Sequence, residues 1–249
     1  MSAVIMNITP DMKLADVLFH NFTLLPVISR FNIKLGFGDK TVSEVCRDAD
    51  VNIDFFLEIT NSYVDEDYIP QKELNSFPVS LIVQYLNKTH QYYLEEKIPE
   101  IGRLIHMVIE AEKTSNDTFI LVENFFTEYM QELTNHINRE ETRVHPYVLE
   151  IESAFLRKEI SKTLYSKIVK YSINNFATEH DNVEEKLFDL KNIIIKYLPP
   201  CNSAGICNTI LIELFRLEKD LNAHASLEDK VLIPKVAAME EKLLSLYKA

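Results

Sequence analysis

Four histidines at nearly equal spacing constrain the fold of this chain more than any other feature. They are His90, His136, His180 and His224. The gaps between them are 46, 44 and 44 residues, and each histidine lies in a long segment with helical periodicity. In an antiparallel bundle of helices of similar length, this spacing brings all four to a similar height. Because the chain has only four glycines, long helices are favoured over a turn-rich β structure. We therefore predict an all-α fold that contains an up-down-up-down four-helix bundle.

Helix-compatible segments around these histidines define the expected helices of the bundle. Their approximate spans are 79–113, 116–146, 158–197 and 202–249, with polar loops between them. Pro99 and Pro234 lie inside the first and last spans, where the missing N–H should kink or interrupt the helix. The second helix is expected to end near Pro146.

The first 70 residues have a different pattern, in which short apolar-periodic segments alternate with turns. The segment Gly36–Asp39 is typical of a turn, and Thr41 followed by Glu44 has the pattern of a capping box at a helix start. His20 is expected to face solvent or to cap a helix. The expected organisation is a small helical domain at 1–70, a linker at 71–78 and a bundle domain at 79–249.

Glutamates follow three of the four histidines at a spacing of four residues, in the pairs His136–Glu140, His180–Glu184 and His224–Glu228. An α-helix places residues four apart on one face, and apolar neighbours such as Leu133 and Leu221 direct these faces toward a core. Imidazole and carboxylate together suit iron or manganese, and a glutamate can bridge two ions. Bound metals would also explain why Glu140 and Glu228 face inward, because an unpaired buried carboxylate is costly. The residues thus favour a di-metal site. The alternative is a structural bundle with incidental histidines.

The remaining histidines and the cysteines are not expected to bind metal. His106 lies more than about 20 Å beyond His90 along an unbroken helix that rises ~1.5 Å per residue. His145 is expected to cap a helix end or to lie at the surface. The three cysteines have an odd count and no C-x-x-C spacing, so we expect neither a disulfide nor a thiolate zinc site.

Net charge and hydropathy exclude several classes of partner. The formal net charge of −12 disfavours nucleic acid and anionic membranes, which attract basic surfaces. No apolar run approaches the ~18 residues of a membrane span. The N-terminal residues also lack the basic and apolar regions of a signal peptide. We expect a cytoplasmic protein that binds neither nucleic acid nor membrane.

Motifs in both halves resemble those of the iron–sulfur cluster repair di-iron proteins, the RIC or YtfE/ScdA family. In the second half these are Glu132…His136-x-x-x-Glu140-Glu141, Glu179-His180-Asp181 and His224-x-x-x-Glu228-Asp229…Ile233-Pro234. In the first half, the run Lys13–Val17, then Phe31-Asn32-Ile33, Gly38 and Thr41–Glu44 are similar to the small N-terminal ScdA domain. Together the matches cover nearly the whole chain, and they imply that the bundle is hemerythrin-like.

The resemblance implies a non-haem di-iron centre with carboxylate and oxo or hydroxo bridges. It assigns His90, His136, His180 and His224 as terminal ligands and Glu140 and Glu228 as bridges. It also implies that Glu132 and Glu179 flank an access route to the metals without binding them. Iron, rather than manganese, follows from the resemblance and not from the ligand types.

The function implied is repair of iron–sulfur clusters damaged by nitrosative or oxidative stress. Iron donation, NO chemistry or both would carry it, with NO reductase-like activity as one form of that chemistry. Partners would be damaged iron–sulfur proteins and NO or O₂, and a homodimer is compatible with these features. The alternative is a hemerythrin-like sensor or carrier that binds O₂ or NO without turnover.

Two departures from the family pattern bear on this choice. The family has an adjacent Cys-Cys pair where this chain reads Leu35-Gly36-Phe37-Gly38, so a step that depends on those thiols is in question here. Glu184 stands where the family tends to have a small residue. It could be an extra ligand, a charge beside the access path or an exposed helix residue, and the last is favoured.

Overall fold

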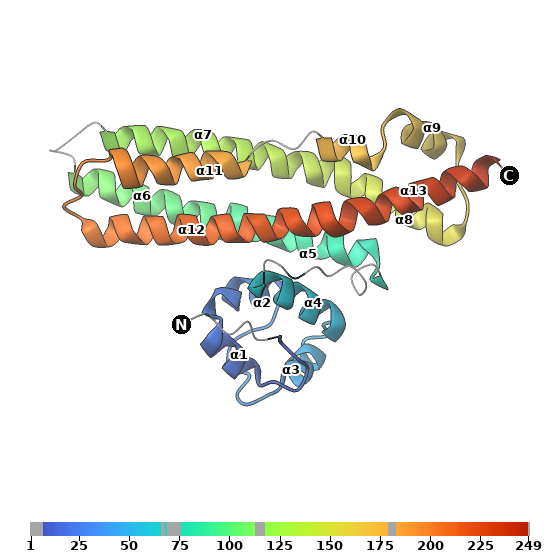
Figure 1. Cartoon of the computed structure of the whole chain (residues 1–249), viewed down its shortest axis with the longest axis horizontal. Helices are drawn as coiled ribbons and strands as arrows, with labels where there is room; N and C mark the ends of the chain where they lie inside the picture. Colours follow the sequence, from blue (N-terminus) through green and yellow to red (C-terminus); the bar gives the residue numbers. More distant parts are fainter. Residues whose placement is uncertain (1–6, 66–67, 69–75, 113–117, 179–182, 249) are drawn as a thin grey trace.

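The computed structural model describes residues 7–65, 68, 76–112, 118–178 and 183–248. Every regular element in these ranges is helical, which confirms the all-α prediction, and strand-like pairing there is limited to one isolated bridge between Lys13 and Thr41. A compact group of short helices lies beside a long helical bundle (Figure 1). No helix in the described ranges is both long enough and apolar enough to cross a membrane.

The N-terminal group contains four α-helices and a short 3₁₀ turn. They are α1 (Leu14–His20), η1 (Phe22–Leu24), α2 (Leu25–Arg30), α3 (Val42–Asp48) and α4 (Ile53–Val64). The predicted capping box forms at α3, where the Thr41 hydroxyl accepts from Glu44 N and the Glu44 carboxylate accepts from Thr41 N. The predicted turn before it contains Gly36 and Gly38, both with positive φ that glycine adopts without strain. His20 is exposed at the end of α1, in agreement with the prediction.

The bundle consists of long helical segments, which we call rods. Three of the rods are built in the same way, with two α-helices joined by a π-helical turn. The first rod is α5 (Val79–Tyr92), η3 (Tyr93–Lys97) and α6 (Ile98–Glu112). The second is α7 (Thr118–Arg139), η4 (Glu140–Val144) and α8 (His145–Arg157). The fourth is α12 (Ala204–Leu227), η6 (Glu228–Leu232) and α13 (Ile233–Lys248).

Each π turn lies immediately before an X-Pro pair, at Pro99, Pro146 and Pro234. Proline removes one N–H donor and crowds the preceding turn, and a wider turn relieves both problems without ending the helix. The helix therefore continues through each proline. The expectation that the second helix ends near Pro146 is wrong, because the rod extends to Arg157.

The third rod is broken where a single helix over 158–197 was predicted. It comprises α10 (Ile173–Thr178), α11 (Val183–Asn192) and a π turn, η5 (Ile193–Tyr197). A separate helix, α9 (Lys162–Lys170), connects α8 to this rod, and Lys158 ends α8 with a left-handed conformation. The break after α9 is fixed locally, since the Asn175 carboxamide accepts from the backbone N of Ser172.

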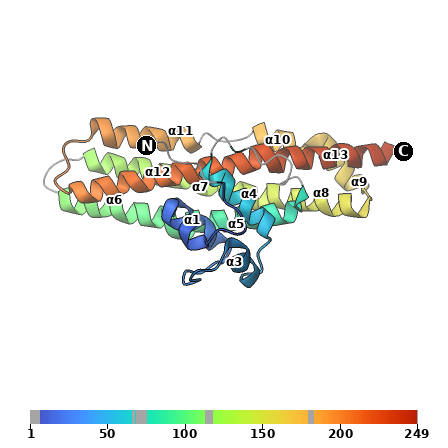
Figure 2. The same cartoon turned by 60° about the horizontal axis from the view of Figure 1, so that its bottom comes forward.

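The N-terminal helices share a hydrophobic core with one half of the bundle. Figures 1 and 2 place this group beside the middle of the bundle, with α2 and α4 closest to α5 and α12. The ring of Phe31 packs against Phe55 and Tyr85, with centroid distances of 6.0 and 5.1 Å. Apolar packing is thus continuous across the junction between the two groups.

A buried ion pair also joins the two groups. Arg30, at the end of α2, donates to both carboxylate oxygens of Asp220 on α12, with Nη1 2.9 Å from Oδ1. Both side chains are at most 5% exposed. The guanidinium lies over the Tyr92 ring at 4.7 Å, and its Nη1 is 3.5 Å from the Tyr85 hydroxyl. The N-terminal group is therefore held in a fixed orientation against the bundle.

Cys201 and Cys207 form a disulfide, which overturns the expectation that the cysteines stay unpaired. The loop before α12 folds back on the first turns of that helix and brings the two sulfur atoms together. Glu112, at the end of α6, holds the loop in place by accepting from Asn202 Nδ2 at 2.9 Å and from Ser203 N at 3.0 Å. The third cysteine, Cys46, is a buried free thiol.

Thiol labelling should report this arrangement. Burial raises the pKa of Cys46 to about 12, so almost no reactive thiolate forms in the folded protein at mildly alkaline pH. Iodoacetamide should modify no cysteine in the native protein, Cys46 alone after unfolding, and all three after unfolding with reductant, as counted by mass spectrometry. Modification of native Cys46 as fast as in the unfolded chain would contradict the buried position.

Candidate metal centre

A polar cluster lies at the seam between two apolar cores of the bundle. Along α12, Leu221 belongs to one core and Leu227 to the other, with His224 between them. Along the first rod, Leu86 and Tyr93 flank His90 in the same way. Because these cores exclude water on both sides, polar groups at the seam must find partners among themselves or in a bound ligand.

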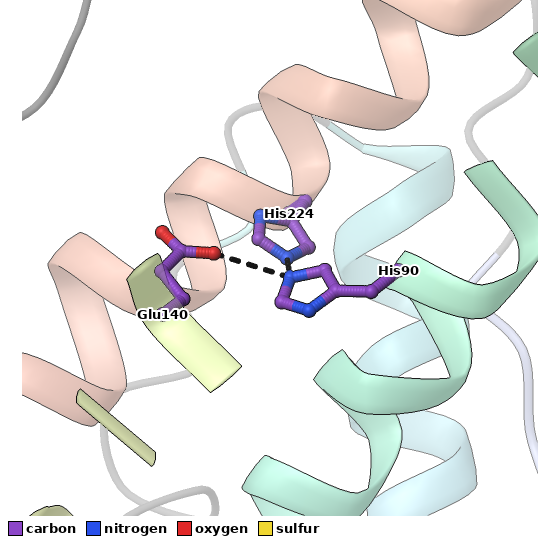
Figure 3. Close-up of side chains that lie close together, drawn as sticks. All are labelled: His90, Glu140 and His224. Carbon is purple, nitrogen blue, oxygen red and sulfur yellow. Dashed lines mark hydrogen bonds and ion pairs between the residues drawn. The ribbon is translucent and has the colours of Figure 1, made fainter. Parts of the chain in front are cut away.

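His90, Glu140 and His224 form the centre of this cluster, and one potential ligand atom from each lies within 4.8 Å of the other two. The three side chains reach in from α5, η4 and α12 and point toward one another (Figure 3). The Nε2 atoms of His90 and His224 are 2.9 Å apart. Glu140 Oε2 is 3.2 Å from His90 Nε2, although without the angles of a hydrogen bond. The three side chains are all buried.

Two more predicted residues join the cluster at its edges. His136 lies one turn before Glu140, and its Nε2 is 2.9 Å from Glu140 Oε1. Glu228 opens the π turn η6, and its Oε2 is 3.4 Å from Nδ1 of His224. The helical spacing of four residues therefore brings the two side chains of each pair into contact.

Further side chains hold the imidazoles in defined orientations. His90 Nδ1 is 3.1 Å from Glu141 Oε1, and Arg139 Nη2 donates to His136 Nδ1 at 3.2 Å. A carboxylate on Nδ1 fixes the ring proton there and leaves Nε2 as the free nitrogen. His90 is in this situation with Glu141, and His224 is in a similar one with Glu228.

The converging atoms fit a cation. With protons on Nδ1, the Nε2 atoms of His90 and His224 present two lone pairs to each other across 2.9 Å, and Glu140 adds a buried oxygen with no hydrogen-bond donor. Electron pairs that converge in this way repel one another unless a proton or a metal ion lies between them. Imidazole and carboxylate are donors suited to iron, manganese or zinc.

The pKa shifts show the same demand for positive charge. Burial alone would raise the pKa of Glu140, but its contacts with His136 and His90 lower it well below the usual value. Burial opposes protonation of His90, yet its two carboxylate neighbours raise its pKa overall. His224 has a pKa well below normal, because burial and the charge of His90 both disfavour a second cation. The pKa directions therefore favour positive charge on His90 and disfavour it on His224.

The other predicted site residues are placed differently or are not described. His180 and Glu179 lie outside the described residues, as does the side chain of Glu184. Glu132 forms a half-exposed ion pair with Lys186 of α11. His106 is 64% exposed in its side chain, as expected for a histidine that does not belong to the cluster.

His145 was expected at a helix end or on the surface, but it is buried against the cluster. Its ring stacks on that of His90 at 5.5 Å with an interplanar angle of 4°. Burial and the charge of His90 lower the pKa of His145 to about 4. The π turn directs the His145 side chain toward the interior. On a regular α-helix through Pro146, residue 145 would point in a different direction.

A cavity of about 210 Å³ reaches the cluster from the N-terminal helices. His224 forms part of its wall, together with Thr89, which precedes His90. Tyr63 of α4 and Arg30 of α2 line the other side. The cavity therefore lies between the two helical groups and ends at one imidazole of the cluster.

Comparisons with known proteins identify the family of the chain. Residues 99–236 match the family described as Hemerythrin HHE cation binding domain. The chain is similar to the iron-sulfur cluster repair protein ScdA of Staphylococcus haemolyticus (strain JCSC1435), with 19% identity over 202 residues, which are 80% of this chain and 85% of that protein. A protein of the same name from Staphylococcus epidermidis (strain ATCC 12228 / FDA PCI 1200) is 16% identical over 159 residues, 64% of this chain and 67% of that protein. The resemblance to iron–sulfur cluster repair proteins is confirmed. Because the matched region covers more than half of its length, the chain belongs to the hemerythrin HHE cation binding domain family.

Proposed function

We propose that this protein is a cytoplasmic di-iron protein that helps restore iron–sulfur clusters damaged by nitrosative or oxidative stress. The observation that carries the proposal is the buried convergence of His90, Glu140 and His224 on one point. Family membership supports a bound cation, and similarity to repair proteins over 80% of the chain supports the repair role. Damaged iron–sulfur proteins would be its partners.

The proposed ligand set contains the three converging residues and three further residues of the predicted site. Its members are His90, His136, His180 and His224 as terminal ligands and Glu140 and Glu228 as bridges. The contact of Glu140 with both His90 and His136 supports a bridging position for its two oxygens. Glu228 contacts His224 on the Nδ1 side, so a bridging role requires its side chain to turn toward the centre.

The surrounding residues would prepare the ligands for the metals. Glu141 holds the proton of His90 on Nδ1, which leaves Nε2 as the donor nitrogen. The apolar cores on both sides limit water at the centre, and the cavity beside His224 offers space for NO or O₂. When bound, the irons would supply sites for these gases and a source of ferrous iron for transfer.

A second candidate is an O₂ or NO sensor or carrier without turnover. The loop Leu35–Gly38 favours it, because this loop contains no thiol where the repair family has a cysteine pair. Cys46 does not replace that pair, since it is buried and unreactive. The two functions share one metal centre and differ in whether a partner protein regains activity.

A repair assay separates the two candidates. A purified [4Fe–4S] dehydratase inactivated by NO is incubated without oxygen with the ferrous protein, and its activity is followed. We expect recovery that exceeds the recovery with metal-free protein, with the Glu140→Leu variant, or with the same amount of ferrous iron in the presence of a chelator. Reversible gas binding without recovery of the dehydratase would contradict the repair function.

A further inference from the structure

We propose that His145 supplies an additional imidazole ligand to the metal centre through its Nε2 atom. This inference rests on the proposed function, because it requires a metal at the cluster. It adds a residue outside the predicted ligand set, one that no sequence motif indicated.

The hydrogen bonding of His145 leaves its Nε2 atom available to bind a metal ion. Its Nδ1 donates to Asn87 Oδ1 at 2.7 Å, so the ring proton is on Nδ1 and the lone pair is on Nε2. Metal-bound histidines commonly donate their second nitrogen to a carbonyl or carboxylate in this way. Asn87 lies three residues before His90 on α5, so one helix orients both stacked imidazoles.

The Nε2 atom of His145 is buried and has no hydrogen-bond partner. Glu140 Oε2 is a second buried acceptor in the cluster without one. Buried acceptors in native proteins are nearly always satisfied, so two unsatisfied ones beside the same imidazole of His90 indicate a missing electron-pair acceptor. His145 is outside the group of three residues whose ligand atoms lie within 4.8 Å of one another, so metal binding requires its ring to turn toward the centre, as it does for Glu228.

The π turn explains how a residue five positions after Glu140 reaches the cluster. On a regular helix with 3.6 residues per turn, positions five apart differ in direction by roughly 140°. The wider turn of η4, with its i→i+5 bonding, brings His145 closer to the face of Glu140. The turn thus places one cluster residue at its start and another directly after its end.

The position equivalent to His145 is apolar in the other rods of this chain. The four X-Pro pairs that follow π turns are Ile98-Pro99, His145-Pro146, Leu198-Pro199 and Ile233-Pro234. Isoleucine therefore serves at the equivalent place in two rods, and Ile98 is buried there. An apolar side chain at this position is therefore compatible with the fold, and packing alone does not explain a polar histidine at position 145.

Paramagnetic NMR of the Co(II)-loaded protein tests the inference. Each imidazole bound to Co(II) through Nε2 gives a far-shifted, exchangeable Nδ1–H resonance, and the bond to Asn87 should protect that of His145 from exchange. We expect one such resonance to be absent in His145→Ile and none in His106→Ile, which alters an exposed histidine. His145→Ile should also weaken Co(II) affinity by more than the roughly 10–100-fold that follows loss of a group that only orients a ligand.

The outcomes are distinct. Identical sets of shifted resonances in the wild type and His145→Ile would overturn this inference and leave the proposed function intact. Wild-type protein that binds no Co(II) would overturn both. His145→Gln, examined in the same way, provides a second variant if the isoleucine variant folds poorly, and circular dichroism checks the fold of each.

Discussion

Replacement of Glu140 by leucine is expected to abolish tight metal binding. Glu140 contacts both His90 and His136, and it contributes the carboxylate at the point of convergence. Its loss should weaken Fe(II) affinity by more than the roughly 10–100-fold caused by loss of a group that only orients a ligand. The affinity is measured by anaerobic titration against a competing chelator.

Two control variants sharpen this comparison. Glu141→Gln changes a residue that contacts His90 Nδ1 and is 43% exposed in its side chain, so its loss of affinity should fall in the roughly 10–100-fold range. Glu128→Leu removes an exposed carboxylate from α7, the helix that leads into η4, and should bind Fe(II) like the wild type. Wild-type affinity in Glu140→Leu would exclude a ligand role for Glu140.

Loss of Arg30 should strongly destabilise the protein. In Arg30→Met, the carboxylate of Asp220 stays buried without its partner. Removal of one member of a buried ion pair typically lowers the free energy of unfolding by about 3–5 kcal/mol. Urea unfolding followed by circular dichroism measures the change in the metal-free protein.

A double variant separates the cost of an isolated charge from the value of the pair. Arg30→Met with Asp220→Leu replaces both charges by apolar groups, and it should recover most of the stability lost in either single variant. Lys167→Met, which breaks an exposed pair with Glu150, should leave the unfolding midpoint nearly unchanged. A double variant no more stable than Arg30→Met would show that Arg30 acts mainly through its contacts with the Tyr92 and Tyr93 rings.

The ion pair also connects the N-terminal group to the metal centre. Asp220 is one helical turn before His224, and Tyr85, which contacts Arg30, lies five residues before His90 on α5. The surface on which the N-terminal helices rest is thus formed by the residues next to two proposed ligands. The docking of these helices determines how much of the cavity beside His224 is enclosed.

Much of the bundle was predictable because its determinants are local. Helical periodicity, the glycine-poor composition and the capping box at Thr41 depend on residues close together in the chain. The pairs His136–Glu140 and His224–Glu228 were predictable for the same reason, since spacing alone puts both members on one helical face. The nearly equal spacing of the histidines also predicted that they lie at a similar height in the bundle. His90 and His224 do lie in contact.

Other features could not be predicted because they depend on how helices accommodate one another. Pro99, Pro146 and Pro234 were expected to kink or end helices, whereas π turns carry each of these helices through its proline, and one of the turns directs His145 inward. The buried Arg30–Asp220 pair joins residues 190 positions apart, which periodicity does not reveal. The Cys201–Cys207 bond depends on a loop that folds back on α12.

Mössbauer spectroscopy of protein loaded with ⁵⁷Fe tests the central claim most directly. After anaerobic loading and gel filtration, we predict roughly two iron ions per chain, as in carboxylate–histidine bundles of this class, and ferric iron whose spins couple to a diamagnetic state after oxidation. The His90→Leu variant should lose this signal. Wild-type protein without bound iron, or a His90→Leu variant with an unchanged spectrum, would contradict a di-iron centre at this cluster.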